Sequence, residues 1–107
     1  MTDVTEIPHL EKAILKHEAV AVIFTRENSP DSIDLLPRIR RLFRRFSAIP
    51  VYHVDMDRHP TAASEFLVYE VPTVMVYYRG TPSVKHVGGV YLPELRAEME
   101  RLSRQMG

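Results

Sequence analysis

Residues 71–80 read VPTVMVYYRG, a proline followed by an apolar, β-branched run that ends at a glycine. Apolar runs of this length without alternation are typical of a strand that lies inside a sheet. The stretch therefore predicts a strand over residues 72–78. It also predicts a turn at residues 80–82 and a last strand over residues 83–87, which together form a hairpin.

Two apolar runs further upstream predict the other central strands. Residues 19–25 read AVAVIFT and carry no polar residue before the final threonine. Residues 51–56 read VYHVDM, a second run rich in β-branched and aromatic side chains. A short edge strand is also predicted over residues 3–7.

Four helices are predicted between and after these strands, each from apolar residues at helical spacing. In chain order, one ends near His17, one begins after Ser29 and has apolar spacing up to Phe46, one covers residues 60–68 and one covers residues 92–106. Ser29 is the expected N-cap of the long helix, with Pro30 at its first position and Pro37 kinking it. The order βαβαβαββα predicts an α/β fold with a central mixed sheet flanked by helices.

The composition indicates one globular domain over residues 1–107, with 45% hydrophobic and 26% charged residues. Fourteen Lys and Arg balance fourteen Asp and Glu, so no net charge draws the chain to nucleic acid or to a membrane. The N-terminal residues offer no apolar core for a signal peptide. We therefore expect a cytoplasmic protein that binds neither nucleic acid nor membrane.

The element order and a set of spaced residues resemble the thioredoxin family over essentially the whole chain. The residues that carry the resemblance are Val54-Asp55-Met56-Asp57, His59-Pro60, Val71-Pro72-Thr73, Gly80 and Val87-Gly88. Pro37 also matches the family's kink proline. The resemblance implies the thioredoxin fold, βαβαβαββα, and a cis peptide bond between Val71 and Pro72.

The first half of the chain departs from the family where its chemistry resides. The place of the family's Cys-Gly-Pro-Cys motif is taken by Ser29, Pro30, Asp31 and Ser32, and the chain contains no cysteine at all. The family's buried acid aligns with Ile23. Dithiol-disulfide exchange requires thiolates, so we expect no disulfide oxidoreductase activity and no cofactor.

Several residue groups suggest other chemistry, but each has a structural explanation that we favour. Ser29 and Ser32 have no visible base for nucleophilic catalysis, and we expect them to cap the helix. The histidines and aspartates of residues 53–59 suggest a metal site, yet we expect no metal. Instead, we expect the aspartates to cap turns and His53 to be a neutral, hydrogen-bonded core residue. The arginines of the long helix, which are Arg38, Arg40, Arg41, Arg44 and Arg45, predict a solvated face.

The resemblance implies a shallow peptide-binding groove formed by Val71, Pro72, Thr73, Gly88 and Gly89, next to the motif position at residues 29–32. Backbone pairing with a ligand does not need the thiols. Our leading hypothesis is a redox-inactive thioredoxin-like module that binds a protein or peptide segment, as an adaptor or chaperone-like domain. Two alternatives stay open: a thiol-independent enzyme or glutathione-type ligand binder that uses Ser29, and a homodimeric scaffold.

Overall fold

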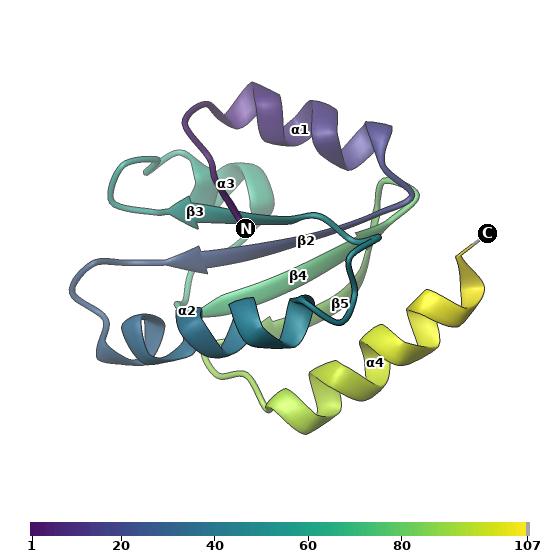
Figure 1. The fold of residues 1–107 in the computed structure, drawn as a ribbon. Helices are drawn as coiled ribbons and strands as arrows, with labels where there is room; N and C mark the ends of the chain where they lie inside the picture. Colours follow the sequence, from purple (N-terminus) through teal and green to yellow (C-terminus); the bar gives the residue numbers. More distant parts are fainter. Residues whose placement is uncertain (107) are drawn as a thin grey trace.

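The computed structural model describes residues 1–106 and arranges them as a five-stranded mixed sheet between two layers of helices (Figure 1). Gly107, the last residue of the predicted domain, lies outside the described residues. The elements are β1 (Thr2–Asp3), α1 (Ile7–Lys16), β2 (Ala19–Thr25), α2 (Pro30–Phe43), β3 (Val51–Asp55), α3 (Ala62–Phe66), β4 (Thr73–Tyr78), β5 (Thr81–Val87) and α4 (Leu92–Gln105). The predicted order of strands and helices is confirmed.

The predicted first strand, residues 3–7, starts one residue too late and is too long, and the predicted short helix is also too long. Only Thr2 and Asp3 pair with β3, and α1 already begins at Ile7, where Pro8 suits the first helical turn. The helix predicted over residues 60–68 is reduced to α3. It ends because Leu67 adopts a left-handed conformation with φ of 56°.

Two predicted boundaries around the later elements also differ. Helix α2 ends at Phe43, although apolar spacing continues to Phe46, because the amides of Arg45 and Phe46 bond to carbonyls three residues back and tighten the chain into a turn. Strand β5 begins inside the predicted turn and contains Pro82. As an edge strand, β5 tolerates a proline there.

The sheet has the strand order β1-β3-β2-β4-β5, so β2 lies at its centre. Strand β2 runs parallel to β3 and antiparallel to β4, and every residue of β2 is buried. An apolar run without alternation is the expected sequence for a strand covered on both faces.

The longest helices in the described part of the chain, α2 and α4, have 14 residues each, and none of its helices is long and apolar enough to cross a membrane.

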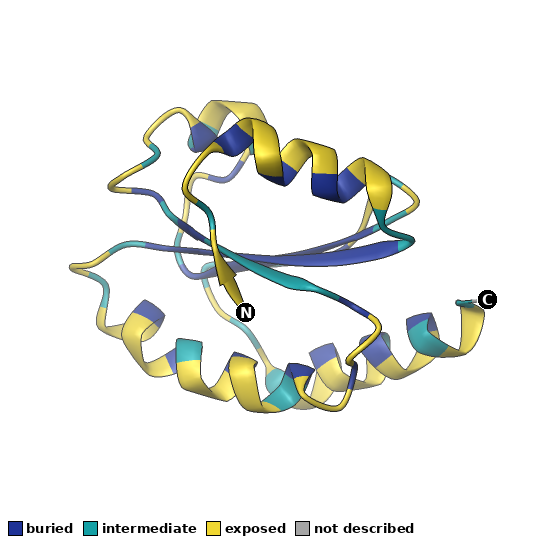
Figure 2. Ribbon diagram, turned by 45° about the horizontal axis from the view of Figure 1, so that its top comes forward, coloured by how far each residue is buried: buried dark blue, intermediate teal, exposed yellow. Residues whose placement is uncertain are grey.

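Two hydrophobic clusters fill the space on the two sides of the sheet, and the helices turn their buried residues inward (Figure 2). Helices α2 and α4 cover one face, where Ile23 and Ile39 lie at zero exposure. Helices α1 and α3 cover the other face, where Leu10 and Phe24 are equally buried. Alternate residues of β2 therefore serve the two clusters, as the strand period of two requires.

The strand registers bring the predicted site residues to one end of the sheet. Phe24 lies opposite Thr73, and Thr73 lies opposite Val87, the last residue of β5. The segment before α2, the Val71-Pro72 segment and the Gly88-Gly89 segment therefore leave the sheet at the same end.

Candidate functional site

A small cavity of about 180 Å³ lies at this end of the sheet, on the α2 and α4 side. Its walls include Pro72, Gly88 and Gly89 of the predicted groove and Asp31 of the motif position. The other lining residues are Asp34, Leu35, Arg38, Val90 and Leu92. The structure thus brings together four of the sequence-predicted site residues, which come from three separate segments.

Val71 and Pro72 precede β4 and are joined by a cis peptide bond. Val71 is half-buried, and its amide and carbonyl have no hydrogen-bond partner among residues 1–106. Backbone groups without a protein partner are the groups that an added extended segment pairs with.

Thr73 is the third residue of the predicted groove and the first residue of β4. It is fully buried, and its Oγ1 donates a hydrogen bond to the carbonyl of Glu70 at 2.7 Å. The side chain of Thr73 therefore holds the turn before β4 and is not presented to a ligand.

Gly88 and Gly89 differ in backbone conformation and in the space beside their Cα atoms. Gly88 has a φ of 73°, a left-handed conformation, and a Cβ there would meet the carboxylate of Glu70. Gly89 does not have a left-handed φ, and a Cβ added to it would meet no atom within 4 Å. Gly88 is thus needed for the backbone turn, whereas Gly89 leaves open space at the cavity.

The two serines at the motif position also differ. Ser29 is the N-cap of α2, and its Oγ accepts a hydrogen bond from the amide of Ser32 at 3.2 Å. The Oγ of Ser32 is buried and has no partner among residues 1–106. The expectation that both serines cap the helix is therefore wrong for Ser32, because its side chain points into protein instead of back to the helix end.

The five arginines of α2 and of the turn after it are all exposed, as predicted, and three of them also line a cavity. Arg38, Arg41 and Arg45 line a second cavity of about 600 Å³ between α2 and α4, together with Arg96. Its remaining lining residues are Leu42, Leu92 and Pro93. Sequence analysis missed this groove because Arg96 belongs to α4, far away in the chain.

A hydrogen-bonded chain that sequence analysis also missed crosses three strands on the same face. Thr25 Oγ1 lies 2.7 Å from His53 Nε2, and His53 Nδ1 lies 2.9 Å from a carboxylate oxygen of Asp3. The order of groups is that of a nucleophile, a base and an orienting acid. Thr25 is only 4% exposed, however, so its hydroxyl is not presented to a substrate.

The polar residues around positions 53–59 each have a structural partner. The carboxylate of Asp55 accepts a hydrogen bond from the backbone amide of Asp57. The carboxylate of Asp57 accepts one from the backbone amide of Glu27 at 2.8 Å, and this bond connects the loop before α2 to the end of β3. His59 bonds to the carbonyl of Val4. Within residues 1–106 no group of three or more histidine and acidic side chains is arranged to hold a metal ion.

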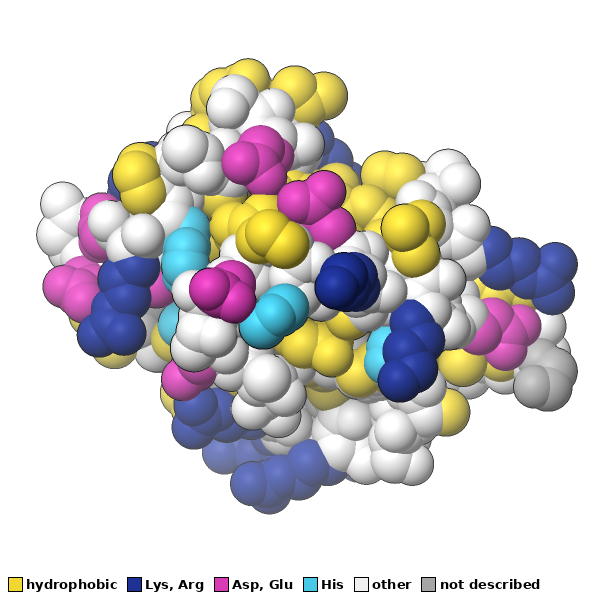
Figure 3. All heavy atoms as spheres, turned by 90° about the horizontal axis from the view of Figure 1, so that it is seen from above, with side chains coloured by type: hydrophobic (Ala, Val, Ile, Leu, Met, Phe, Trp, Pro, Cys, Tyr) yellow, Lys and Arg dark blue, Asp and Glu magenta, His cyan; other side chains and the backbone are white. Residues whose placement is uncertain are grey.

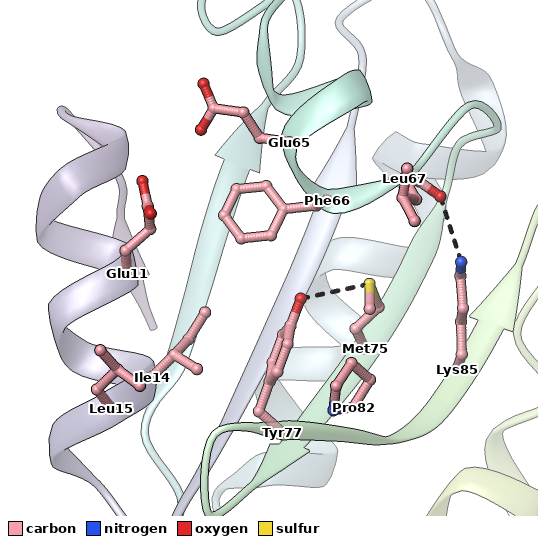
Figure 4. A pocket seen from close by; sticks show the side chains of 10 residues that line it. All are labelled: Glu11, Ile14, Leu15, Glu65, Phe66, Leu67, Met75, Tyr77, Pro82 and Lys85. Carbon is pink, nitrogen blue, oxygen red and sulfur yellow. Dashed lines mark hydrogen bonds between the residues drawn. The ribbon is translucent and has the colours of Figure 1, made fainter.

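The opposite face of the sheet has its own cavity, of about 450 Å³, between α1, α3 and the β4-β5 hairpin (Figure 4). Phe66, Met75 and Tyr77 point into it, and Glu11 and Glu65 lie at its rim. Hydrophobic side chains reach the surface on this face, with acidic side chains beside them (Figure 3).

Burial raises the pKa of Tyr77 to about 12, so its phenol is neutral at physiological pH.

Comparison with known proteins agrees with this geometry. The family model for thioredoxin matches residues 3–101. The chain is similar to the thioredoxin-like protein YdfQ of Bacillus subtilis (strain 168), with 23% identity over 104 residues, 97% of this chain and 93% of that protein. It is 32% identical to mitochondrial thioredoxin O of Oryza sativa subsp. japonica over 67% of this chain and 42% of that protein. In structure it is similar to oxidised thioredoxin from Plasmodium falciparum, with a TM-score of 0.85, 19% identity, and coverage of 96% of this chain and 98% of the other.

Proposed function

Because this chain belongs to the thioredoxin family and has no cysteine, we propose that it is a redox-inactive module that binds an extended protein segment, as an adaptor or chaperone-like domain. The segment lies along Val71 and Pro72 and passes Gly88 and Gly89. The proposal places the protein in the cytoplasm, with a protein segment rather than nucleic acid or a membrane as its partner.

The free backbone of Val71 is the observation that carries this proposal. Its amide and carbonyl have no partner among residues 1–106, and they lie where the chain enters β4 beside the cavity formed by Pro72, Gly88 and Gly89. A ligand strand satisfies such groups with main-chain hydrogen bonds, which need no thiol and tolerate varied ligand sequences.

The open space at Gly89 supports close approach of a ligand backbone. Gly89 is exposed, and nothing occupies the volume next to its Cα. A large side chain there would fill the space that the ligand needs without colliding with the protein. Gly89→Leu is therefore a sharper probe of the groove than any change to Pro72, which is buried.

The proposal is tested by NMR titration of ¹⁵N-labelled protein with a pool of random-sequence peptides of about ten residues, a length that spans about 33 Å when extended. We expect the amides of Val71 and Gly89 to shift first. Gly89→Leu should abolish these shifts, and Thr81→Leu, at the far end of β5, should keep them. The proposal is wrong if the peptides shift other surfaces only, or if both variants respond like the wild type.

A further inference from the structure

The cavity at Pro72 and the arginine-lined cavity are parts of one groove. The two cavities share Arg38 and Leu92 as lining residues, so one begins where the other ends. The groove passes between α2 and α4, which cover the same face of the sheet (Figure 1). A segment held at Pro72 therefore has a continuous path between these helices.

The charge of the groove changes along this path. At the Pro72 end, Asp31 and Asp34 line the wall, and Asp34 pairs with Arg38 at 3.4 Å. Further along, Arg41 and Arg45 have no carboxylate partner among residues 1–106.

Arg96 completes the basic end of the groove from α4, and it already pairs with Glu100 at 3.1 Å. The whole chain has no net charge, so this positive charge is a local feature. The side chains of Leu42, Leu92 and Pro93 give the same stretch apolar walls. An arginine that lies beside apolar surface binds a carboxylate more strongly than a fully solvated cation does, because less water competes for the hydrogen bonds.

We propose that the bound segment carries acidic side chains just beyond the residues that pair with Val71, and that Arg41, Arg45 and Arg96 bind these side chains. This inference rests on the proposed function. Arg41 and Arg45 are about one helical turn apart, about 6 Å along the end of α2 and the turn after it. An extended chain covers that distance in about two residues, so the acidic part of the segment is a short run.

A protein segment fits this groove better than nucleic acid. None of the seven residues lining the arginine end is aromatic, so the groove offers no platform for base stacking. The far end of the path is lined by Asp31 and Asp34, which would repel a continuous phosphate backbone. A peptide whose negative charges are confined to one half matches both ends.

The probe is a fluorescein-labelled peptide of about ten residues, uncharged in one half and with four glutamates in the other, made in both orders, with glutamine versions as controls. Fluorescence anisotropy reports its affinity. We expect the better glutamate peptide to bind wild-type protein at least about tenfold more tightly than its glutamine version, and added salt to reduce the difference.

The matched variants use two sides of α2 and of the turn after it. Arg41→Glu with Arg45→Glu should remove the preference for glutamate. Arg40→Glu with Arg44→Glu makes the same change of charge at exposed residues that line a different cavity, and it should keep most of the preference. A lysine version of the peptide should bind the Arg41 and Arg45 variant more tightly than it binds the wild type.

Gly89→Leu separates the two proposals. If glutamate and glutamine peptides bind equally and both are lost in Gly89→Leu, the groove function stands and the acidic preference is wrong. If binding of the glutamate peptide depends on Arg41 and Arg45 but is unchanged in Gly89→Leu, the proposed function and the continuous path are both wrong. Equal losses in the two arginine variants, or tighter binding of a single-stranded oligonucleotide at the same arginines, would overturn the acidic-segment inference.

Discussion

The hydroxyl oxygen of Thr25 lies 2.7 Å from Nε2 of His53, a contact between the neighbouring parallel strands β2 and β3. A carboxylate only accepts hydrogen bonds, so Nδ1 of His53 donates to Asp3, while Nε2 of the same ring bonds to the Thr25 hydroxyl. The bond satisfies a buried polar group at the end of the central strand. The chain of Thr25, His53 and Asp3 therefore has a structural role rather than a catalytic one.

We predict that His53→Ala lowers the free energy of unfolding by about 1–3 kcal/mol, because it leaves the buried Thr25 hydroxyl without a partner. Asp3→Asn should change the free energy by less than about 0.5 kcal/mol, since the Asp3 side chain is 76% exposed. Urea denaturation of both variants measures these effects. The double variant His53→Ala with Thr25→Val should lose less free energy of unfolding than the sum of the losses in the two single variants. Losses that are strictly additive would argue against an interaction between the two side chains.

The two serines before and within the first turn of α2 should respond in opposite ways. Ser29→Ala removes the cap that accepts the amide of Ser32, and we expect it to cost about 1 kcal/mol. Ser32→Ala removes a buried hydroxyl that has no partner, so it should be neutral or stabilising by up to about 1 kcal/mol. Thermal unfolding of the two variants compares them directly, and a larger loss for Ser32→Ala would show that its hydroxyl has a partner in solution.

Restoring both thiols should not restore an efficient reductase. In Ser29→Cys with Ser32→Cys, the Asp31 carboxylate disfavours the thiolate, and one unit of pKa already means about tenfold less thiolate at neutral pH. Ile23 is fully buried in the core on the α2 side and offers no group to accept a proton. We expect insulin reduction at least about tenfold slower than by a thioredoxin with the intact motif.

Adding Asp31→Asn to the double cysteine variant is the control for this explanation. It removes the carboxylate and should raise the rate, while Ile23 still limits it. Turnover by the double variant equal to that of a thioredoxin would show that the chain had lost only its thiols.

Tyr77 should make stability depend on pH in the alkaline range. Burial raises its pKa to about 12 from 10, so the folded state favours the neutral phenol. The resulting stabilisation is fully present below pH 10 and is lost as the pH rises toward about 12, by at most about 3 kcal/mol. Chemical denaturation at several pH values should show this loss, and Tyr77→Phe should remove it. Tyr69→Phe, at a ring that is 69% exposed, should keep the wild-type profile.

The local pattern of the sequence was enough to predict most elements of the fold. The unbroken apolar run of β2 indicates a strand covered on both faces, and Ser29 with Pro30 marks the start of α2, because strand burial and helix capping depend on neighbouring residues. The absence of cysteine in residues 1–107 is likewise read from the sequence alone, and it is the basis for expecting no disulfide exchange. The misplaced boundaries lie where a few local hydrogen bonds compete, as in the turn after Phe43.

Only the tertiary structure decided what surrounds the candidate site. Asp3 and His53 are fifty residues apart, and the register of β1 on β3 brings them together. Arg96 joins Arg41 and Arg45 because α2 and α4 pack on one face of the sheet. Contacts of this kind depend on strand register and helix packing, which are set by the whole chain at once, and no short stretch of sequence contains them.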